Sequence, residues 1–144
     1  QKAVDVAKEM PEGTVILGSD TVVAADGKIL GKPKSHEEAY EMIRRLAGRS
    51  HQVYTGVCLV KKGPEGEADT VVSFYDETDV NVSPMTEKEI REYADSEEPM
   101  DKAGSYAVQG FFARYIDGLK GSYANVMGLP VHLVYQELKK LGAL

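Results

Sequence analysis

The sequence predicts a single domain of the α/β class, with helices flanking a mixed, largely antiparallel sheet. Three observations lead to this prediction: β-branched apolar runs of strand length, apolar residues repeated at helical spacing behind capping residues, and an Asp26-Gly27 pair that favours a tight hairpin. At 144 residues the chain has the usual size of one domain. No internal repeat or linker divides it.

The first elements follow from apolar spacing and turn residues. Lys2 to Glu9 carries an apolar stripe at helical spacing and is predicted to be a helix that ends at Pro11-Glu12-Gly13. A strand begins at Thr14 to Leu17 and continues to the Asp26-Gly27 turn, after which Lys28-Ile29-Leu30 returns beside it. The sequence therefore predicts a strand that leads into a hairpin.

Two capping boxes predict helices. Ser35 and Glu38 precede apolar residues at helical spacing, and this helix is expected to close at Gly48. Thr86 and Glu89 form a second box, whose helix is expected to end at Pro99. A final helix should begin at Pro130, with an apolar stripe made of Val131, Val134, Leu138 and Leu141.

The remaining segments are predicted to be strands and loops. Val53 to Val60 is apolar on both faces, which is typical of a central strand, and Thr70 to Val82 returns beside it after a polar turn. Two strands punctuated by glycine are expected at Ser105 to Val108 and Phe111 to Ile116. A loop should then run from Asp117 to Pro130.

Composition excludes several classes of function. The net charge of −6 argues against a wide, sequence-independent grip on nucleic acid, which needs a basic face. A small phosphorylated ligand remains open, because a few lysines and a metal ion can neutralise it locally. No run approaches the length of about 18 apolar residues that a membrane span requires, so no membrane partner is expected. The single cysteine fits a cytoplasmic protein.

Asp20 and Lys32 are the first candidate site residues. Asp20 interrupts an apolar strand, where an ionised carboxylate is costly unless it is paired or bound to a cation; the alternative is a carboxylate that caps a turn. Lys32 follows Gly31 and precedes Pro33, so that its ammonium is presented at a defined turn, although a solvated surface lysine has the same pattern.

Two later segments contain polar groups suited to a nucleotide. Gln109, between Val108 and Gly110, can donate and accept hydrogen bonds as the edge of a base requires, or it can lie on an exposed strand face. The segment from Ser122 to Pro130 leads into a helix, whose first amides attract phosphate oxygens; a purely structural role is the alternative.

Other catalytic patterns are missing from the sequence. His36, His51 and His132 are scattered and lack metal-ligand spacing, and there is neither a P-loop nor a G-x-S-x-G motif. Cys58 lies inside a predicted strand, where a small hydrophobic residue is the simplest interpretation. No residue is an obvious covalent nucleophile.

Six short motifs, taken together and in order, resemble the Maf family of nucleoside triphosphate pyrophosphatases. They are Gly18-Ser19-Asp20-Thr21, Gly31-Lys32-Pro33, Leu46-Ala47-Gly48-Arg49-Ser50-His51, Glu98-Pro99-Met100-Asp101-Lys102-Ala103-Gly104, Val108-Gln109-Gly110 and Val126-Met127-Gly128-Leu129-Pro130. The resemblance implies hydrolysis of a nucleoside triphosphate to the monophosphate and pyrophosphate, with a divalent metal cation such as Mg²⁺ or Mn²⁺. It also implies two lobes around a cleft and a homodimer.

The resemblance assigns roles to five residues. Asp20 matches the family's general base and is a candidate metal ligand, while Lys32 and Lys2 match lysines that contact phosphate. Thr21 and Gln109 match positions tied to the choice of base, and their identities resemble the branch that acts on dTTP and UTP. Two alternatives remain: a nucleotide-binding regulator of septum formation without turnover, and a pyrophosphatase for 7-methyl-GTP.

The family pattern also contains a first strand and a Ser-x-Ser-Pro-Arg-Arg loop whose arginines contact the triphosphate. Residues 1–144 contain no counterpart of that loop. We therefore expect a single Maf-like domain over residues 1–144 that lacks this strand and loop.

Overall fold

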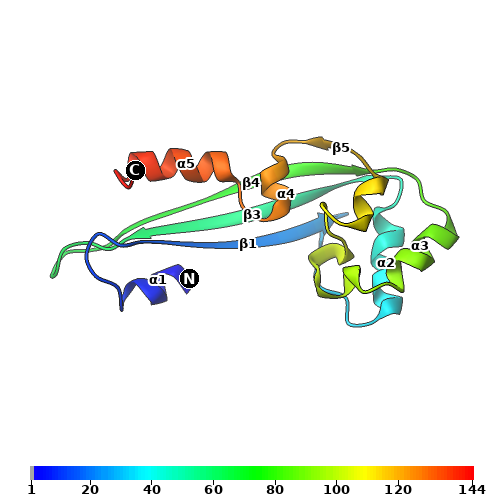
Figure 1. Cartoon of the computed structure of the whole chain (residues 1–144), viewed down its shortest axis with the longest axis horizontal. Coiled ribbons are helices and arrows are strands. Elements are labelled where there is room, and N and C mark those ends of the chain that lie inside the picture. The colour runs from blue at the N-terminus through cyan, green and yellow to red at the C-terminus, as the bar shows by residue number, and fades with distance from the viewer. Residues whose placement is uncertain (1) are drawn as a thin grey trace.

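The computed structural model describes residues 2–144 and is built on one antiparallel sheet (Figure 1). The strand order is β2-β1-β3-β4-β5, and every neighbouring pair is antiparallel. The strands are β1 (Val15–Ala25), β2 (Lys28–Leu30), β3 (Ser50–Lys61), β4 (Thr70–Val82) and β5 (Ile116–Lys120). The predicted hairpin, the central position of β3 and its long pairing with β4 are confirmed.

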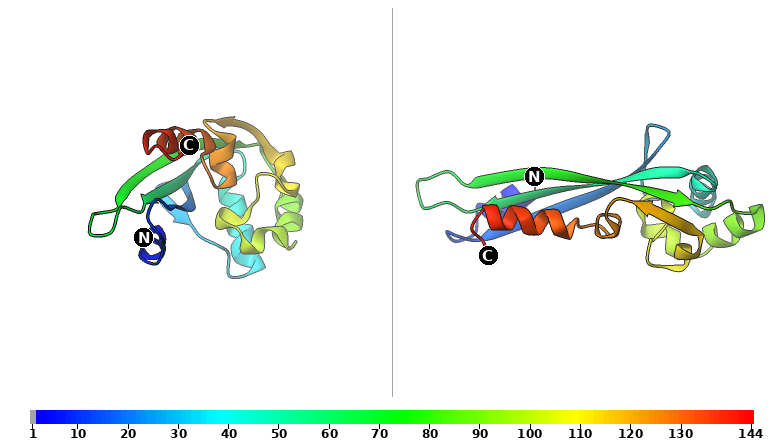
Figure 2. Two further views of the ribbon diagram at one scale, coloured as in Figure 1. Left: turned by 60° about the vertical axis from the view of Figure 1, so that its left-hand side comes forward. Right: turned by 90° about the horizontal axis from the view of Figure 1, so that it is seen from above.

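Helices gather at two ends of the long ribbon made by β1, β3 and β4 (Figure 1, Figure 2). The helices are α1 (Lys2–Ala7), α2 (His36–Leu46), α3 (Glu87–Ala94), α4 (Tyr123–Met127) and α5 (Val131–Lys140). At one end, α1 and α5 pack on opposite faces of the ribbon, while α2 and α3 lie together at the other end. None of the helices found between residues 2 and 144 is long and apolar enough to cross a lipid bilayer.

The main core fills the space between the sheet and the end that holds α2 and α3. Its fully buried members include Ile43, Leu46, Val80 and Phe112. A second cluster joins α1 to β1 and β3, and a third joins α5 to β3 and β4. Burial of this apolar surface stabilises the packing of both groups of helices on the one sheet.

The register of β1 against β3 decides which side chains face which helices. Asp20 lies opposite Gly56, and Thr21 lies opposite Thr55. Because successive side chains of a strand point to opposite faces, Asp20 lies on the face covered by α1 and Thr21 on the face covered by α4 and α5. Within residues 2–144, β2 pairs only with Val23 to Ala25, so the part of β1 that holds Asp20 is an edge of the sheet.

The two strands predicted at Ser105 to Val108 and Phe111 to Ile116 are wrong. The chain instead ends a 3-10 turn at Ser105, η2 (Ala103–Ser105), and forms another, η3 (Phe111–Tyr115); a third, η1 (Glu98–Asp101), precedes them. Gly104 and Ser105 adopt left-handed φ angles of 71° and 68°, which no extended strand accommodates. The coiled backbone also turns the ring of Phe112 into the main core.

The loop predicted from Asp117 to Pro130 contains two elements, so that prediction is also wrong. β5 extends the sheet, with Leu119 opposite Val80. α4 begins behind Ser122, whose hydroxyl accepts a hydrogen bond from the Asn125 amide at 3.2 Å. A short edge strand and a single helical turn carry too little apolar periodicity for the sequence to reveal them.

Helix ends agree with the predictions only in part. The Thr86 box is complete, whereas only the Ser35 half of the first box is found in residues 2–144. α1 ends at Ala7 instead of Glu9, and α3 ends at Ala94, ahead of Pro99. Of the predicted apolar stripe, Val134, Leu138 and Leu141 pack on the sheet. Val131, the first residue of α5, is 56% exposed.

Candidate active site

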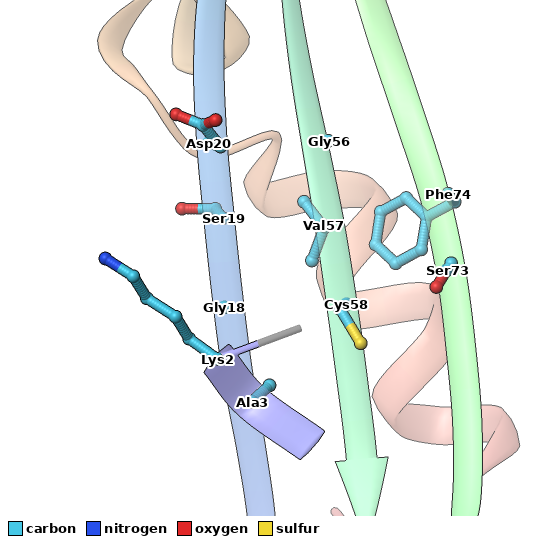
Figure 3. Close-up of a pocket in the computed structure, with 10 residues that line it drawn as sticks. All are labelled: Lys2, Ala3, Gly18, Ser19, Asp20, Gly56, Val57, Cys58, Ser73 and Phe74. Atoms are coloured by element: carbon cyan, nitrogen blue, oxygen red, sulfur yellow. The ribbon is translucent and has the colours of Figure 1, made fainter. Parts of the chain in front are cut away.

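A groove of about 530 Å³ lies on the face of the sheet that α1 covers (Figure 3). α1 contributes Lys2 and Ala3, and the three long strands contribute Gly18, Ser19, Asp20, Gly56, Val57, Cys58, Ser73 and Phe74. Gly18 and Gly56 have no side chains to fill the space, which leaves the groove open. Among the described residues that line it, Lys2 and Asp20 are the charged ones.

Asp20 lies at the surface of the groove. Its side chain is exposed, so the prediction of a buried charge that needs compensation is wrong. The reason is local, because the residue directly opposite on β3 is Gly56, whose lack of a side chain leaves the carboxylate uncovered by its neighbour on the sheet. The side chain of Lys2 extends along β1 toward Ser19 and Asp20, so α1 and β1 bring an ammonium and a carboxylate to the same groove (Figure 3).

A second cavity, the Gln109 pocket, lies on the opposite face of the same strand and measures about 230 Å³. It is lined by Thr21, Val23, Val53, Asp101, Lys102, Ala103, Tyr106, Ala107, Val108, Gln109, Val126, Met127 and Gly128. Thr21 and Gln109 come from distant parts of the sequence, and the fold places both in this wall. The motif around Val126 to Gly128, also singled out in the sequence, closes the pocket from the α4 side.

A close approach of backbone to β1 shapes one wall of the Gln109 pocket. Gly104 donates a hydrogen bond to the carbonyl of Gly31 at 3.1 Å, and a Cβ added at Gly104 would lie 2.8 Å from a methyl group of Val23. Glycine therefore fits best here, because a φ of 71° is costly for most residues and a Cβ would collide with Val23. This contact fixes the segment that carries Asp101 and Lys102.

Lys32 does not join Asp20 in the groove. It is exposed, and it follows Gly31, which is bonded to Gly104. The pKa of Asp101 is lowered chiefly by its hydrogen bond with Lys102, and the charge of Lys32 adds a smaller effect in the same direction. Lys32 therefore lies near one wall of the Gln109 pocket, apart from Lys2 and Asp20.

A buried polar network holds Thr21 in place. The hydroxyl oxygens of Thr21 and Thr55 are 2.9 Å apart, and Thr55 donates to the backbone carbonyl of Asn125 at 3.0 Å. The amide of Asn125 donates to Val53 at 3.2 Å and to Thr78 at 2.8 Å, and Thr55, Thr78 and Asn125 are fully buried. The role of Thr55 was missed in the sequence, although it is a polar residue within the apolar run of β3, and Asn125 was noted only as part of the segment from Ser122 to Pro130.

His51 lies behind the Gln109 pocket and contacts one of its lining residues, Tyr106. Its Nε2 lies 2.6 Å from the hydroxyl of Tyr106, which lines the pocket, and burial lowers the pKa of His51 to about 4. The imidazole is therefore neutral at pH 7, and its Nε2 and the tyrosine hydroxyl share one hydrogen bond. Within residues 2–144 no three His, Cys, Asp or Glu side chains are grouped so that they could hold a metal ion by themselves.

Comparison with known proteins identifies the family. A family model described as Maf-like protein matches residues 1–141. The chain belongs to the Maf family. The matched range contains every residue that lines the groove and the Gln109 pocket. The resemblance noted in the six sequence motifs is thereby confirmed.

Three curated relatives carry the name dTTP/UTP pyrophosphatase. The protein of Lachnoclostridium phytofermentans is 48% identical over 141 residues, that of Agathobacter rectalis 51% over 135 residues, and that of Carboxydothermus hydrogenoformans 49% over 142 residues. The alignments cover 98%, 92% and 99% of this chain. They span 71%, 64% and 74% of the respective relatives, so each relative is longer than the part matched here.

Proposed function

We propose that this Maf family protein hydrolyses dTTP and UTP to the monophosphate and pyrophosphate. The observation that carries the proposal is the placement of two neighbouring residues of β1. Asp20 lines the groove together with Lys2 on one face of the sheet. Thr21 lines the Gln109 pocket on the opposite face, at the same edge strand. The names of the curated relatives support the same substrates.

The Gln109 pocket is proposed to hold the pyrimidine base. The amide of Gln109 can donate one hydrogen bond and accept another, which suits the mixed edge of uracil or thymine. Thr21 adds a hydroxyl whose position is fixed by Thr55. Apolar residues such as Val53 and Met127 provide surfaces for the ring faces.

The groove is proposed to hold the reacting phosphates. Asp20 accepts a proton from the attacking water as the water oxygen bonds to the α-phosphorus, and the bond from that phosphorus to the bridging oxygen breaks. The electron pair leaves with pyrophosphate. Lys2 offsets negative charge on phosphate oxygens in the groove from the α1 side. Lys32 does not line the groove, so its role toward phosphate rests on the family resemblance alone.

A divalent cation, Mg²⁺ or Mn²⁺, fits this groove as a partner of the substrate. Asp20 supplies one carboxylate to the groove, and Mg²⁺ is commonly bound by one or two carboxylates together with substrate phosphates. Asp20 is the proposed ligand. When bound, the ion would withdraw charge from the phosphate oxygens.

Pyrophosphate release tests the proposal. We expect the full-length protein to release pyrophosphate from dTTP and UTP in an assay coupled to inorganic pyrophosphatase. Asp20→Asn should reduce the rate by at least about 100-fold, whereas Asp5→Asn, which removes an exposed carboxylate of α1, should not. Near-normal turnover in Asp20→Asn would exclude that residue as the general base.

The same assay separates the alternatives. Nucleotide binding without any product would favour a regulator of septum formation, and faster hydrolysis of 7-methyl-GTP than of dTTP or UTP would favour the other enzymatic branch. The proposal includes a cytoplasmic location and a homodimer. Fluorescence microscopy of a tagged protein and light scattering during size-exclusion chromatography test these two points.

A further inference from the structure

Glu98 is a half-buried carboxylate at the start of η1 that has no role in the function proposed above. Its two oxygens accept three hydrogen bonds, from the hydroxyl of Tyr93 at 2.7 Å and from the backbone amides of Phe111 at 2.7 Å and Phe112 at 3.1 Å. Tyr93 is buried, and burial raises the pKa of its hydroxyl, so it remains a donor. Hydrogen bonds to an ionised acceptor are stronger than those between neutral groups.

The carboxylate also lies directly over Gly110. A Cβ added to Gly110 would lie 2.0 Å from Oε1 of Glu98, so no side chain fits at this position while the carboxylate is there. The φ and ψ angles of Gly110, −105° and −154°, are extended and open to any residue. A side chain at position 110 would therefore have to displace the Glu98 carboxylate, whereas the backbone conformation itself does not demand glycine.

These contacts connect two walls of the Gln109 pocket. η1 begins at Glu98 and ends at Asp101, which lines one wall. The other wall is the turn from Ala107 to Gly110, closed by a hydrogen bond of 3.3 Å from the Gly110 amide to the Ala107 carbonyl. The carboxylate of Glu98 ties the amides that follow this turn to η1.

We propose that Glu98 is a positioning residue that fixes the Gln109 turn and thereby sets the preference of the enzyme for pyrimidine nucleotides. Glu98 does not line the pocket and acts through the backbone that presents the Gln109 amide. The side chain of Gln109 is exposed, so few contacts of its own hold it. The inference rests on the proposed function, because it assigns base selection to Gln109.

Steady-state kinetics of the full-length protein test the role of Glu98. Glu98→Ala should raise KM for dTTP and UTP by about tenfold or more, the effect of losing charge-assisted hydrogen bonds, while kcat changes by less than about threefold. The ratio of kcat/KM between UTP and GTP should fall by a similar factor. Glu98→Gln keeps the shape and one acceptor oxygen, so a smaller increase in KM is expected.

Two matched controls separate positioning from loss of charge or stability. Glu97→Ala removes an exposed carboxylate one residue earlier and should leave KM unchanged. Tyr93→Phe removes a buried hydrogen bond but keeps both backbone contacts of Glu98, so it should lower thermal stability without changing KM by more than about twofold.

A double-mutant cycle gives a sharper criterion. Gly110→Ala should displace the carboxylate and raise KM as Glu98→Ala does, but it should have no further effect in a protein that already carries Glu98→Ala. Additive effects in this cycle, or an unchanged KM and substrate ranking in both Glu98 variants, would overturn the positioning role while the proposed function stands. A wild-type protein that hydrolyses no nucleotide would overturn both.

Discussion

Acidification is expected to destabilise the fold through His51. Its imidazole is 1% exposed, and burial holds the pKa at about 4 in the folded chain against 6.5 for an ordinary histidine. At pH 7 both states are neutral and the group has no effect. As the pH falls from 6.5 to 4, the unfolded chain takes up a proton that the folded chain does not, so the free energy of unfolding decreases. Below pH 4 both states are protonated at His51, and this residue causes no further decrease.

The size of the effect follows from the two pKa values. At about 1.4 kcal/mol per pKa unit, the difference between 6.5 and about 4 corresponds to roughly 3 kcal/mol of unfolding free energy. This is a large part of the stability of a typical domain, which is about 5–15 kcal/mol. Most of it should be lost by pH 4.5.

Urea denaturation followed by circular dichroism at pH 7 and pH 4.5 measures this effect. His51→Gln keeps a neutral group that can hydrogen-bond to Tyr106 but cannot titrate, so its free energy of unfolding should fall by about 2–3 kcal/mol less than that of the wild type. His132→Gln replaces an exposed histidine of α5 and should behave as the wild type. An equal loss in the wild type and in His51→Gln would refute the reasoning.

The other predictions concern single contacts around the two cavities. Thr55→Val should lower the free energy of unfolding by about 1–3 kcal/mol, because two buried polar partners lose their hydrogen bond, and Thr55→Ser should recover most of this loss. Gly104→Ala should cost roughly 2–4 kcal/mol in thermal denaturation, against about 1 kcal/mol for Gly66→Ala, which has a similar positive φ but open space around it. Lys2→Ala should raise KM for UTP by about tenfold, whereas Lys8→Ala, which removes an exposed lysine just after the end of α1, should leave it unchanged; equal effects would remove Lys2 from the site.

Elements with strong local signals were predictable from the sequence. The Asp26-Gly27 hairpin, the capped helices α2 and α3, and the pair β3 and β4 each have a turn, a cap or a periodicity within one segment. The chain between residues 103 and 127 has no such signal. Its 3-10 turns and α4 depend on distant partners, such as the aromatic core around Phe112 and the buried contacts of Asn125, which no local pattern encodes.

The candidate site was predictable in its residues but not in its arrangement. Asp20 and Gln109 were recognised by their chemistry and by the family motifs, yet a carboxylate within an apolar strand was read as buried because the sequence does not show that Gly56 lies opposite it. That Lys2 lines the groove while Lys32 does not was equally hidden, since it depends on how α1 and β2 are placed around β1.

The arrangement of β1 has a consequence for how this protein can change. Asp20 and Thr21 are consecutive residues that serve opposite faces, so the pairing of β1 with β3 fixes both cavities at once. Inserting or deleting one residue in β1 ahead of Asp20 would exchange the two faces and put the carboxylate on the side of Gln109 and the threonine in the groove. Substitutions can adjust either cavity alone, but length changes in this strand alter both together.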